Sequence, residues 1–330
     1  MNETLRLIFI ALLAVSLLVL WQRWEKWQAV ESSSPTLTLA TPEAANASQN
    51  VERTENGGLP APTQSLSVKN EDGIDTPAEA NNVAALQIPL ETDWLSIAIG
   101  DDGANLASAK LKKHLTDKGL PLALLQKNDK RFFIAQSGLI DGAGQTPYPY
   151  HNSKFYAESP PAVGGFSASD KEVATLSFRA EAGDIVLTKT YAFRRGDYLI
   201  DVRLQAENVG AVALSPYGYF QLARDRKEPK SHSTFLPFFF GAAMFTEESK
   251  FIKMAFDDLN SADYPRKSQD GWIGFIERYF AVAWIPEIGD HEFFMHTGAD
   301  GIGRVGVILP FGEIAAGETK TVSTKLFVGA

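Results

Sequence analysis

Cysteine is absent from this chain of 330 residues, and histidine occurs only five times. Without a thiol the chain has no disulfide framework, no catalytic cysteine and no cysteine-ligated metal site. Positive charge is scarce too, because 40 acidic residues outnumber 31 basic ones and give a formal net charge of −9. Phosphate affinity needs a basic surface, so we expect no nucleic acid among the partners. The glycine patterns of phosphate loops, dinucleotide folds and serine-hydrolase elbows are also missing, which favours binding over catalysis and predicts no cofactor and no metal.

A long apolar run occurs once, at the start of the chain. Residues 7–21 are uncharged, and eleven of the 15 are Leu, Ile, Val or Phe. Counting from residue 5 to 22, with Arg6 reaching the head groups, brings the run close to the length of a spanning helix. Trp21, Trp24 and Trp27 follow at intervals of three, as expected for side chains at the membrane interface. The sequence therefore predicts a transmembrane anchor in the lipid bilayer over residues 1–27.

Two alternatives for this segment make different demands on its sequence. A cleaved signal peptide needs a site of small residues after the apolar run, whereas residues 21–27 are bulky and charged. A buried core helix needs a polar outer face, and no polar pattern interrupts the run. The orientation stays open at this point, because basic residues occur on both sides of the run.

Aromatic residues are absent from residues 28–83, where Ser, Thr, Ala, Pro, Asn and Glu dominate. Such a segment cannot bury enough apolar surface to offset its ordering entropy. It also carries most of the net charge, −6 of the −9. We therefore expect a disordered acidic linker over residues 28–83.

The remaining part, residues 84–330, shows the period of two that is typical of strands. Ile200, Val202 and Leu204 alternate with polar residues, so residues 198–207 read as a strand with one buried face. Two similar runs, 171–180 and 184–193, precede it through short glycine-containing turns, which predicts an antiparallel meander. Further strands are expected at residues 86–89, 94–99, 131–136, 271–276, 280–285, 293–296, 305–309 and 321–328. Helices are expected only at residues 107–116 and 247–256. The pattern predicts a mainly β domain, a large antiparallel β-sandwich.

Candidate sites are few. His291 and His296 are five residues apart, which places them on opposite faces of a strand and argues against a shared metal. The tripeptide at residues 195–197 (RGD) fits a hairpin turn better than an adhesion motif. Phe238, Phe239 and Phe240 form either an exposed edge for a partner or a buried strand. A second set, Trp272, Phe275, Tyr279, Phe280 and Trp284, forms either a ligand wall or, more in keeping with a large sandwich, core packing.

The order of segments resembles a known family. The motifs that carry the likeness are residues 87–95 (QIPLETDWL), 136–139 (QSGL), 188–191 (TKTY), 195–198 (RGDY), 240–243 (FGAA), 271–273 (GWI), 278–286 (RYFAVAWIP) and 323–329 (STKLFVG). With the apolar start and its tryptophans, they make the chain similar to the amino-terminal part of the Gram-negative YidC family of membrane protein insertases.

This resemblance implies several expectations. The amino terminus would be cytoplasmic and the β domain periplasmic, at the bacterial inner membrane. The domain would be a β-supersandwich of the galactose-mutarotase-like kind, without catalysis. The partners would be nascent inner-membrane proteins and the Sec translocon with its accessory subunits. Family members continue into a membrane core with the insertase groove, and none of that core is expected in these 330 residues.

Two other functions stay open. A periplasmic carbohydrate-binding or mutarotase-like protein would need a histidine acid and a glutamate base facing one sugar ring. A membrane-tethered scaffold would use Phe238, Phe239 and Phe240 as a docking edge.

Overall fold

The computed structural model describes residues 87–142, 148–158, 166–167, 173–227, 239–260 and 266–330. Within these residues nearly all regular structure is β, and the one helical element is the 3₁₀ turn η1 (Asp258–Asn260). No helix among them is long and apolar enough to cross a bilayer. The predicted anchor with Trp21, Trp24 and Trp27, and the predicted linker, lie outside the described residues and stay predictions.

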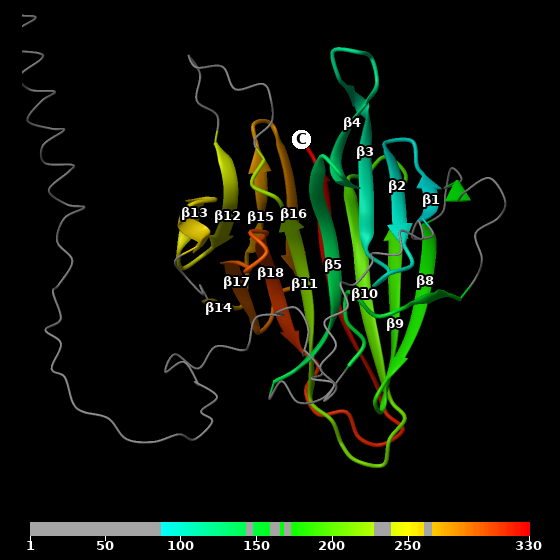
Figure 1. The fold of residues 1–330 in the computed structure, drawn as a ribbon. Helices are drawn as coiled ribbons and strands as arrows, with labels where there is room; N and C mark the ends of the chain where they lie inside the picture. The colour runs from blue at the N-terminus through cyan, green and yellow to red at the C-terminus, as the bar shows by residue number, and fades with distance from the viewer. Residues whose placement is uncertain (1–86, 143–147, 159–165, 168–172, 228–238, 261–265) are drawn as a thin grey trace, which may run out of the picture. The chain divides into compact units, whose positions relative to one another are not determined.

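The strands form two sheets (Figure 1). The first sheet has ten strands in the order β14-β17-β18-β11-β5-β4-β3-β2-β1-β7. Their bounds are β1 (Gln87–Glu91), β2 (Leu95–Gly100), β3 (Leu106–Leu115), β4 (Pro121–Asn128), β5 (Arg131–Asp141), β7 (Phe166–Ser167), β11 (Pro216–Arg224), β14 (Arg266–Ser268), β17 (His291–Thr297) and β18 (Gly303–Pro310).

The second sheet has nine strands in the order β13-β12-β15-β16-β19-β10-β9-β8-β6. Their bounds are β6 (Tyr156–Ala157), β8 (Ala174–Ala182), β9 (Ile185–Phe193), β10 (Leu199–Asn208), β12 (Phe240–Thr246), β13 (Lys250–Ala255), β15 (Trp272–Glu277), β16 (Phe280–Pro286) and β19 (Thr319–Gly329). Neighbouring strands in both sheets are antiparallel except β1 and β7. The prediction of a large antiparallel β-sandwich is confirmed.

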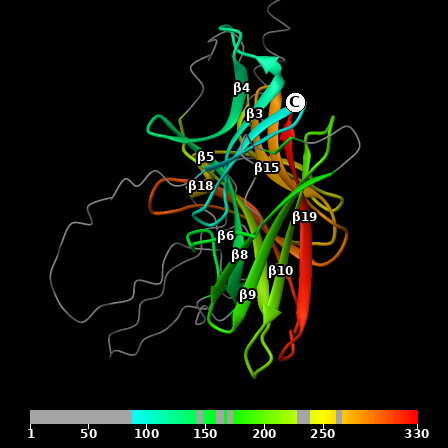
Figure 2. The same ribbon diagram turned by 90° about the vertical axis from the view of Figure 1, so that its right-hand side faces the viewer.

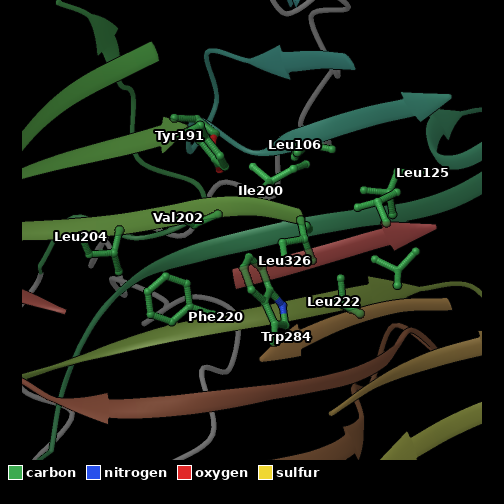
Figure 3. Packing of buried hydrophobic residues seen from close by; sticks show 14 of the residues in the cluster. Leu106, Leu125, Tyr191, Ile200, Val202, Leu204, Phe220, Leu222, Trp284 and Leu326 are labelled. Carbon is green, nitrogen blue, oxygen red and sulfur yellow. The ribbon is translucent and has the colours of Figure 1, made fainter. Parts of the chain in front are cut away.

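The core lies between the two sheets and draws side chains from both. Phe220 of β11 meets Trp284 of β16 with ring centroids 5.4 Å apart. Figure 3 shows these two rings beside labelled aliphatic side chains such as Leu326 of β19. Fully burying one such side chain contributes roughly 1.5–3 kcal/mol, so this layer is the main source of stability.

The predicted meander is confirmed as β8, β9 and β10, which are adjacent and antiparallel. Ile200, Val202 and Leu204 are fully buried, as their alternation predicts. The residues 195–197 form the predicted turn: Gly196 has a φ of 68° and donates its N–H to Asp93 Oδ1 at 2.8 Å. A positive φ is readily available to glycine, which explains this residue at the turn.

Both predicted helices are wrong. The first, residues 107–116, is strand β3, in which Ala109 and Leu111 point inward while Lys110 and Lys112 are exposed. The second, residues 247–256, is a turn followed by β13, which pairs with β12 from Thr246↔Lys250 to Gly241↔Ala255. Lysine-rich sequences favour helix locally, but pairing with a neighbouring strand overrides that propensity in both places.

Candidate functional site

The two described phenylalanines of the predicted docking segment point in different directions. Phe240 faces the core: its ring centroid lies 4.3 Å from Arg224 Cζ and 4.8 Å from the centroid of Phe256. The Phe239 ring centroid lies 5.1 Å from Nζ of Lys253, whose strand neighbours Ile252 and Met254 pack inward. Phe239 is therefore on the outer face of this sheet, and Phe240 is a packing residue. Phe238 lies outside the described residues, and partner binding by this segment stays a prediction.

The second aromatic set also divides between core and surface. Phe275 and Trp284 are buried in the core, as the core-packing interpretation predicts. Trp272 lies against the outer-face residue Phe251, with ring centroids 5.9 Å apart. Tyr279 is exposed, and the Phe280 ring contacts His114 at 5.4 Å. No continuous ligand wall arises from these five residues.

Beneath Phe240 lies a fully buried arginine. The Arg224 guanidinium carbon lies 4.3–6.0 Å from four aromatic ring centroids, those of Phe133, Phe240, Phe256 and Phe275. Its Nη2 donates to Glu277 Oε2 at 2.5 Å, while its Nε and Nη1 have no hydrogen-bond partner among the described residues. Burial lowers the pKa of Arg224 to about 10, and the Glu277 carboxylate opposes that shift, so the guanidinium is charged at neutral pH.

Glu277 also accepts a hydrogen bond from Arg131 Nη2 at 2.7 Å, so two arginines share one carboxylate. Burial alone would raise the pKa of Glu277, but the charges of Arg224 and Arg131 outweigh it and lower that pKa. The two arginines lie on strands of the ten-stranded sheet and Glu277 on the nine-stranded sheet. Arg131, Arg224 and Glu277 therefore link the two sheets, and we call these three residues the charged clamp.

A second polar group joins the sheets further along β5, at Ser137. Lys189 Nζ is fully buried and donates to the carbonyl oxygens of Gly103 at 2.6 Å and Ser137 at 2.8 Å. Burial lowers the pKa of Lys189 to about 7. Tyr191, two residues on, donates its hydroxyl to Ala104 O at 2.7 Å. Two of these carbonyls, those of Gly103 and Ala104, belong to the loop between β2 and β3, and the third belongs to Ser137 on β5.

A small aromatic cluster covers the outer face of the ten-stranded sheet: Tyr219, Phe294 and Ile308 are buried there, separate from the main core. Beside it lies a pocket of about 490 Å³. The pocket residues are Tyr217, Lys267, Ser268, Asp290, His291, Glu292, Ile308 and Pro310. Lys267 and Glu292 are paired across β14 and β17, so the pocket contains charges of both signs.

The described histidines show whether the pocket could perform acid–base chemistry. In the pocket, His291 has its Nδ1 2.7 Å from Gly289 O and its Nε2 3.1 Å from Asp270 O, so backbone carbonyls occupy both ring nitrogens. His296 lies five residues further along β17, on the opposite face of the strand. His151 is buried, with Nδ1 2.5 Å from the Tyr219 hydroxyl, and burial lowers its pKa to about 4. His291 therefore lines the pocket together with Glu292, but both of its ring nitrogens are already engaged by the backbone.

Sequence reasoning missed Lys189 and Arg224. A signal was present, because each occupies an inward position of its strand. Lys189 alternates with the buried Leu187 and Tyr191, and Arg224 follows Phe220 and Leu222. A charged residue in an inward register predicts a buried polar contact.

The fold resembles that of solved structures. A galactose mutarotase related enzyme from Lactobacillus acidophilus matches with a TM-score of 0.51 at 9% identity, over 74% of this chain and 98% of that one. At this identity the likeness shows the fold alone. The architecture is therefore a galactose-mutarotase-like β-sandwich.

Sequence comparisons then identify the family. The family model for the YidC periplasmic domain matches residues 87–330. Proteins called membrane protein insertase YidC from Nitrosomonas europaea and Nitrosospira multiformis are each 33% identical, over 98% and 99% of this chain. The chain belongs to the YidC family. It spans 54% and 58% of the length of these two relatives.

Proposed function

We propose that this chain takes part in the insertion and folding of bacterial inner-membrane proteins, with nascent membrane proteins as substrates. The observation that carries the proposal is the match to insertases over nearly the whole chain, together with the family model over the β domain. Because the chain spans about half the length of these relatives, we propose that it contributes the anchored β domain to an insertase rather than the whole activity.

We further propose that residues 1–27 cross the inner membrane once, with the amino terminus cytoplasmic and the β domain periplasmic. The apolar run with its three tryptophans supports the anchor, and the match to a periplasmic-domain family supports the periplasmic side. In this arrangement the outer face with Phe239 is a candidate contact for the Sec translocon and its accessory subunits.

A depletion strain tests the function. In a bacterial strain depleted of its own insertase, the chain alone should not restore growth. A chimera in which residues 1–330 replace the matching part of the N. europaea insertase should restore it. A folded chimera that fails to insert membrane proteins would contradict the proposal, and so would rescue by the chain alone.

The same chimera tests the partner. Because residues 1–330 lack cysteine, Phe239→Cys provides a single attachment point for a cross-linker once any cysteines in the N. europaea part have been replaced. Cross-links to Sec subunits are expected. Cross-links only to unrelated envelope proteins would favour the scaffold function.

We also propose that the domain is not an enzyme. Backbone carbonyls occupy both ring nitrogens of His291, which leaves this pocket histidine poorly placed to act as a general acid on a bound sugar. Titrating the chain with free aldoses in a calorimeter should release no heat. Heat with a sugar, abolished by Glu292→Gln, would support the carbohydrate function instead.

A further inference from the structure

The β3–β4 hairpin ends in an apolar and basic tip that the function proposed above does not use. Leu115 and Leu120 flank the turn, and each is 61% exposed. Between and beside them, residues 112–118 contain Lys112, Lys113 and Lys118 but a single acidic residue, Asp117. Exposed apolar side chains that lie together, rather than singly, mark a candidate interaction surface.

The tip has a defined conformation. The Thr116 N–H donates to Leu120 O at 2.8 Å, and the Gly119 N–H donates to Thr116 O at 2.8 Å. Leu115 and Pro121 close the hairpin as a strand pair. The leucines are therefore presented by a structured turn.

A second exposed tip lies beside the first. The ring of His114 packs against Phe280, with centroids 5.4 Å apart, and so joins β3 to the β15–β16 hairpin. That hairpin presents Tyr279, which is 69% exposed, and Arg278, whose guanidinium lies 5.5 Å from the Tyr279 ring. Figures 1 and 2 both place the β3–β4 hairpin at the end of the domain where the chain's C-terminus lies.

The two tips make one surface, the basic–apolar end, consisting of Lys113, Leu115, Lys118, Leu120, Arg278 and Tyr279. Lys112 is engaged with Glu91 at 3.2 Å, whereas no acidic residue pairs with Lys113 or Lys118 in the described part of the chain. Leucine and tyrosine that project beside lysine and arginine fit the head-group region of an anionic bilayer, where apolar tips enter and basic groups meet phosphate.

We propose that the basic–apolar end binds the surface of a bilayer that contains anionic phospholipid. The proposal rests on the membrane location proposed above and adds a specific contact to it. The surface fits an anionic bilayer because exposed apolar side chains lie beside lysines that pair with no acidic residue in the described part of the chain. The contact would hold the domain with this end toward the membrane.

Single cysteines test the contact, since the chain has none of its own. The full chain with Leu120→Cys, labelled with a polarity-sensitive fluorophore, is reconstituted into vesicles of phosphatidylcholine with or without phosphatidylglycerol. We expect a blue shift and quenching by spin-labelled lipid in the anionic vesicles. Added salt should weaken both, because it screens the attraction.

Val212→Cys is the matched control. Val212 is 69% exposed and lies just beyond the end of β10, which pairs with the start of β19 and is therefore at the opposite end from the C-terminus. A label there should report water in both kinds of vesicle. The variant K113Q/K118Q should reduce quenching at position 120 by at least about fivefold, because each lysine near an anionic surface contributes roughly that factor in affinity.

Absence of quenching at position 120 in a folded chain would overturn the proposal, as would equal signals in neutral and anionic vesicles. Binding of this end to an acidic protein would give the same negative result with vesicles. Rescue by the chimera does not depend on this outcome, so failure of the lipid contact and failure of the proposed function are distinguishable.

Discussion

At the scale of single residues, Lys189 links protonation to stability. Its buried ammonium donates to two carbonyls, and burial lowers its pKa to about 7, compared with about 10.4 for an unfolded lysine. Between these values the unfolded chain binds one more proton than the folded chain. Stability should therefore rise with pH in this range, by up to about 1.4 kcal/mol per pH unit.

Lys189→Met should flatten this rise between pH 7 and about 9.5, because methionine carries no proton to release. Urea denaturation at a series of pH values measures the slope. The exposed Lys127→Met on β4 is the control and should keep the original slope. Above about pH 10 the raised pKa values of Tyr191 and Tyr219 act in the opposite direction, so the comparison ends below that point. An unchanged slope in Lys189→Met would assign the pH dependence to other groups.

The same residue shows what the sequence could and could not predict at this scale. Its inward register is visible from the alternation Leu187, Lys189, Tyr191. Its acceptors are not, because Gly103 and Ser137 come from other strands and loops 86 and 52 residues away. Contacts between residues so far apart in sequence depend on the whole fold, which local patterns do not contain.

At the scale of elements, prediction succeeded where the apolar period was unbroken. The strand predicted at 198–207 alternates over its whole length and matches β10 nearly to its ends. The prediction for the segment that forms β3 failed because its exposed half, with Lys112, Lys113 and His114, reads as a polar helix surface. Its core side chains Leu106, Ala109 and Leu111 do not keep an unbroken period of two, because the pairing with β2 shifts register between Leu106 and Ser108.

The candidate docking segment could not be resolved from sequence for a related reason. Three consecutive phenylalanines look equally apolar in sequence, although a strand sends successive side chains to opposite faces. In the structure Phe240 packs on Arg224 and Phe239 lies near Lys253 on the outer face. Because successive side chains alternate in this way, at most every second residue of such a segment can contact a partner on one face of the sheet.

At the scale of the whole molecule, the central question is what makes two large sheets one unit. The apolar layer supplies most of the energy, but it is not directional. The charged clamp adds a specific link, because Arg131 and Arg224 come from the ten-stranded sheet and Glu277 from the nine-stranded sheet. The pattern of strands could predict the two sheets, whereas this link required the three-dimensional arrangement of residues up to 146 positions apart.

Glu277→Gln should lower the free energy of unfolding by about 3 kcal/mol or more, because it leaves the fully buried Arg224 without its counter-charge. Since the folded pKa of Glu277 lies below its ordinary value, the stabilisation is present above the unfolded pKa of about 4.3 and is lost as pH falls through the folded value. The variant should therefore also weaken the acid dependence of stability. Glu181→Gln, which breaks only the exposed pair with Arg179, should change stability by about 0.5 kcal/mol or less.

Urea denaturation at pH 7 and at a series of pH values below about 4.3, followed by tryptophan fluorescence and by far-ultraviolet circular dichroism, measures both effects. If the clamp and the apolar layer couple the sheets, the two signals should shift together in Glu277→Gln, since loss of one inter-sheet link weakens a single cooperative unit. Separate transitions for the two signals would mean that each sheet unfolds alone. A stability equal to that of Glu181→Gln would show that the aromatic rings around Arg224 hold its charge without the carboxylate.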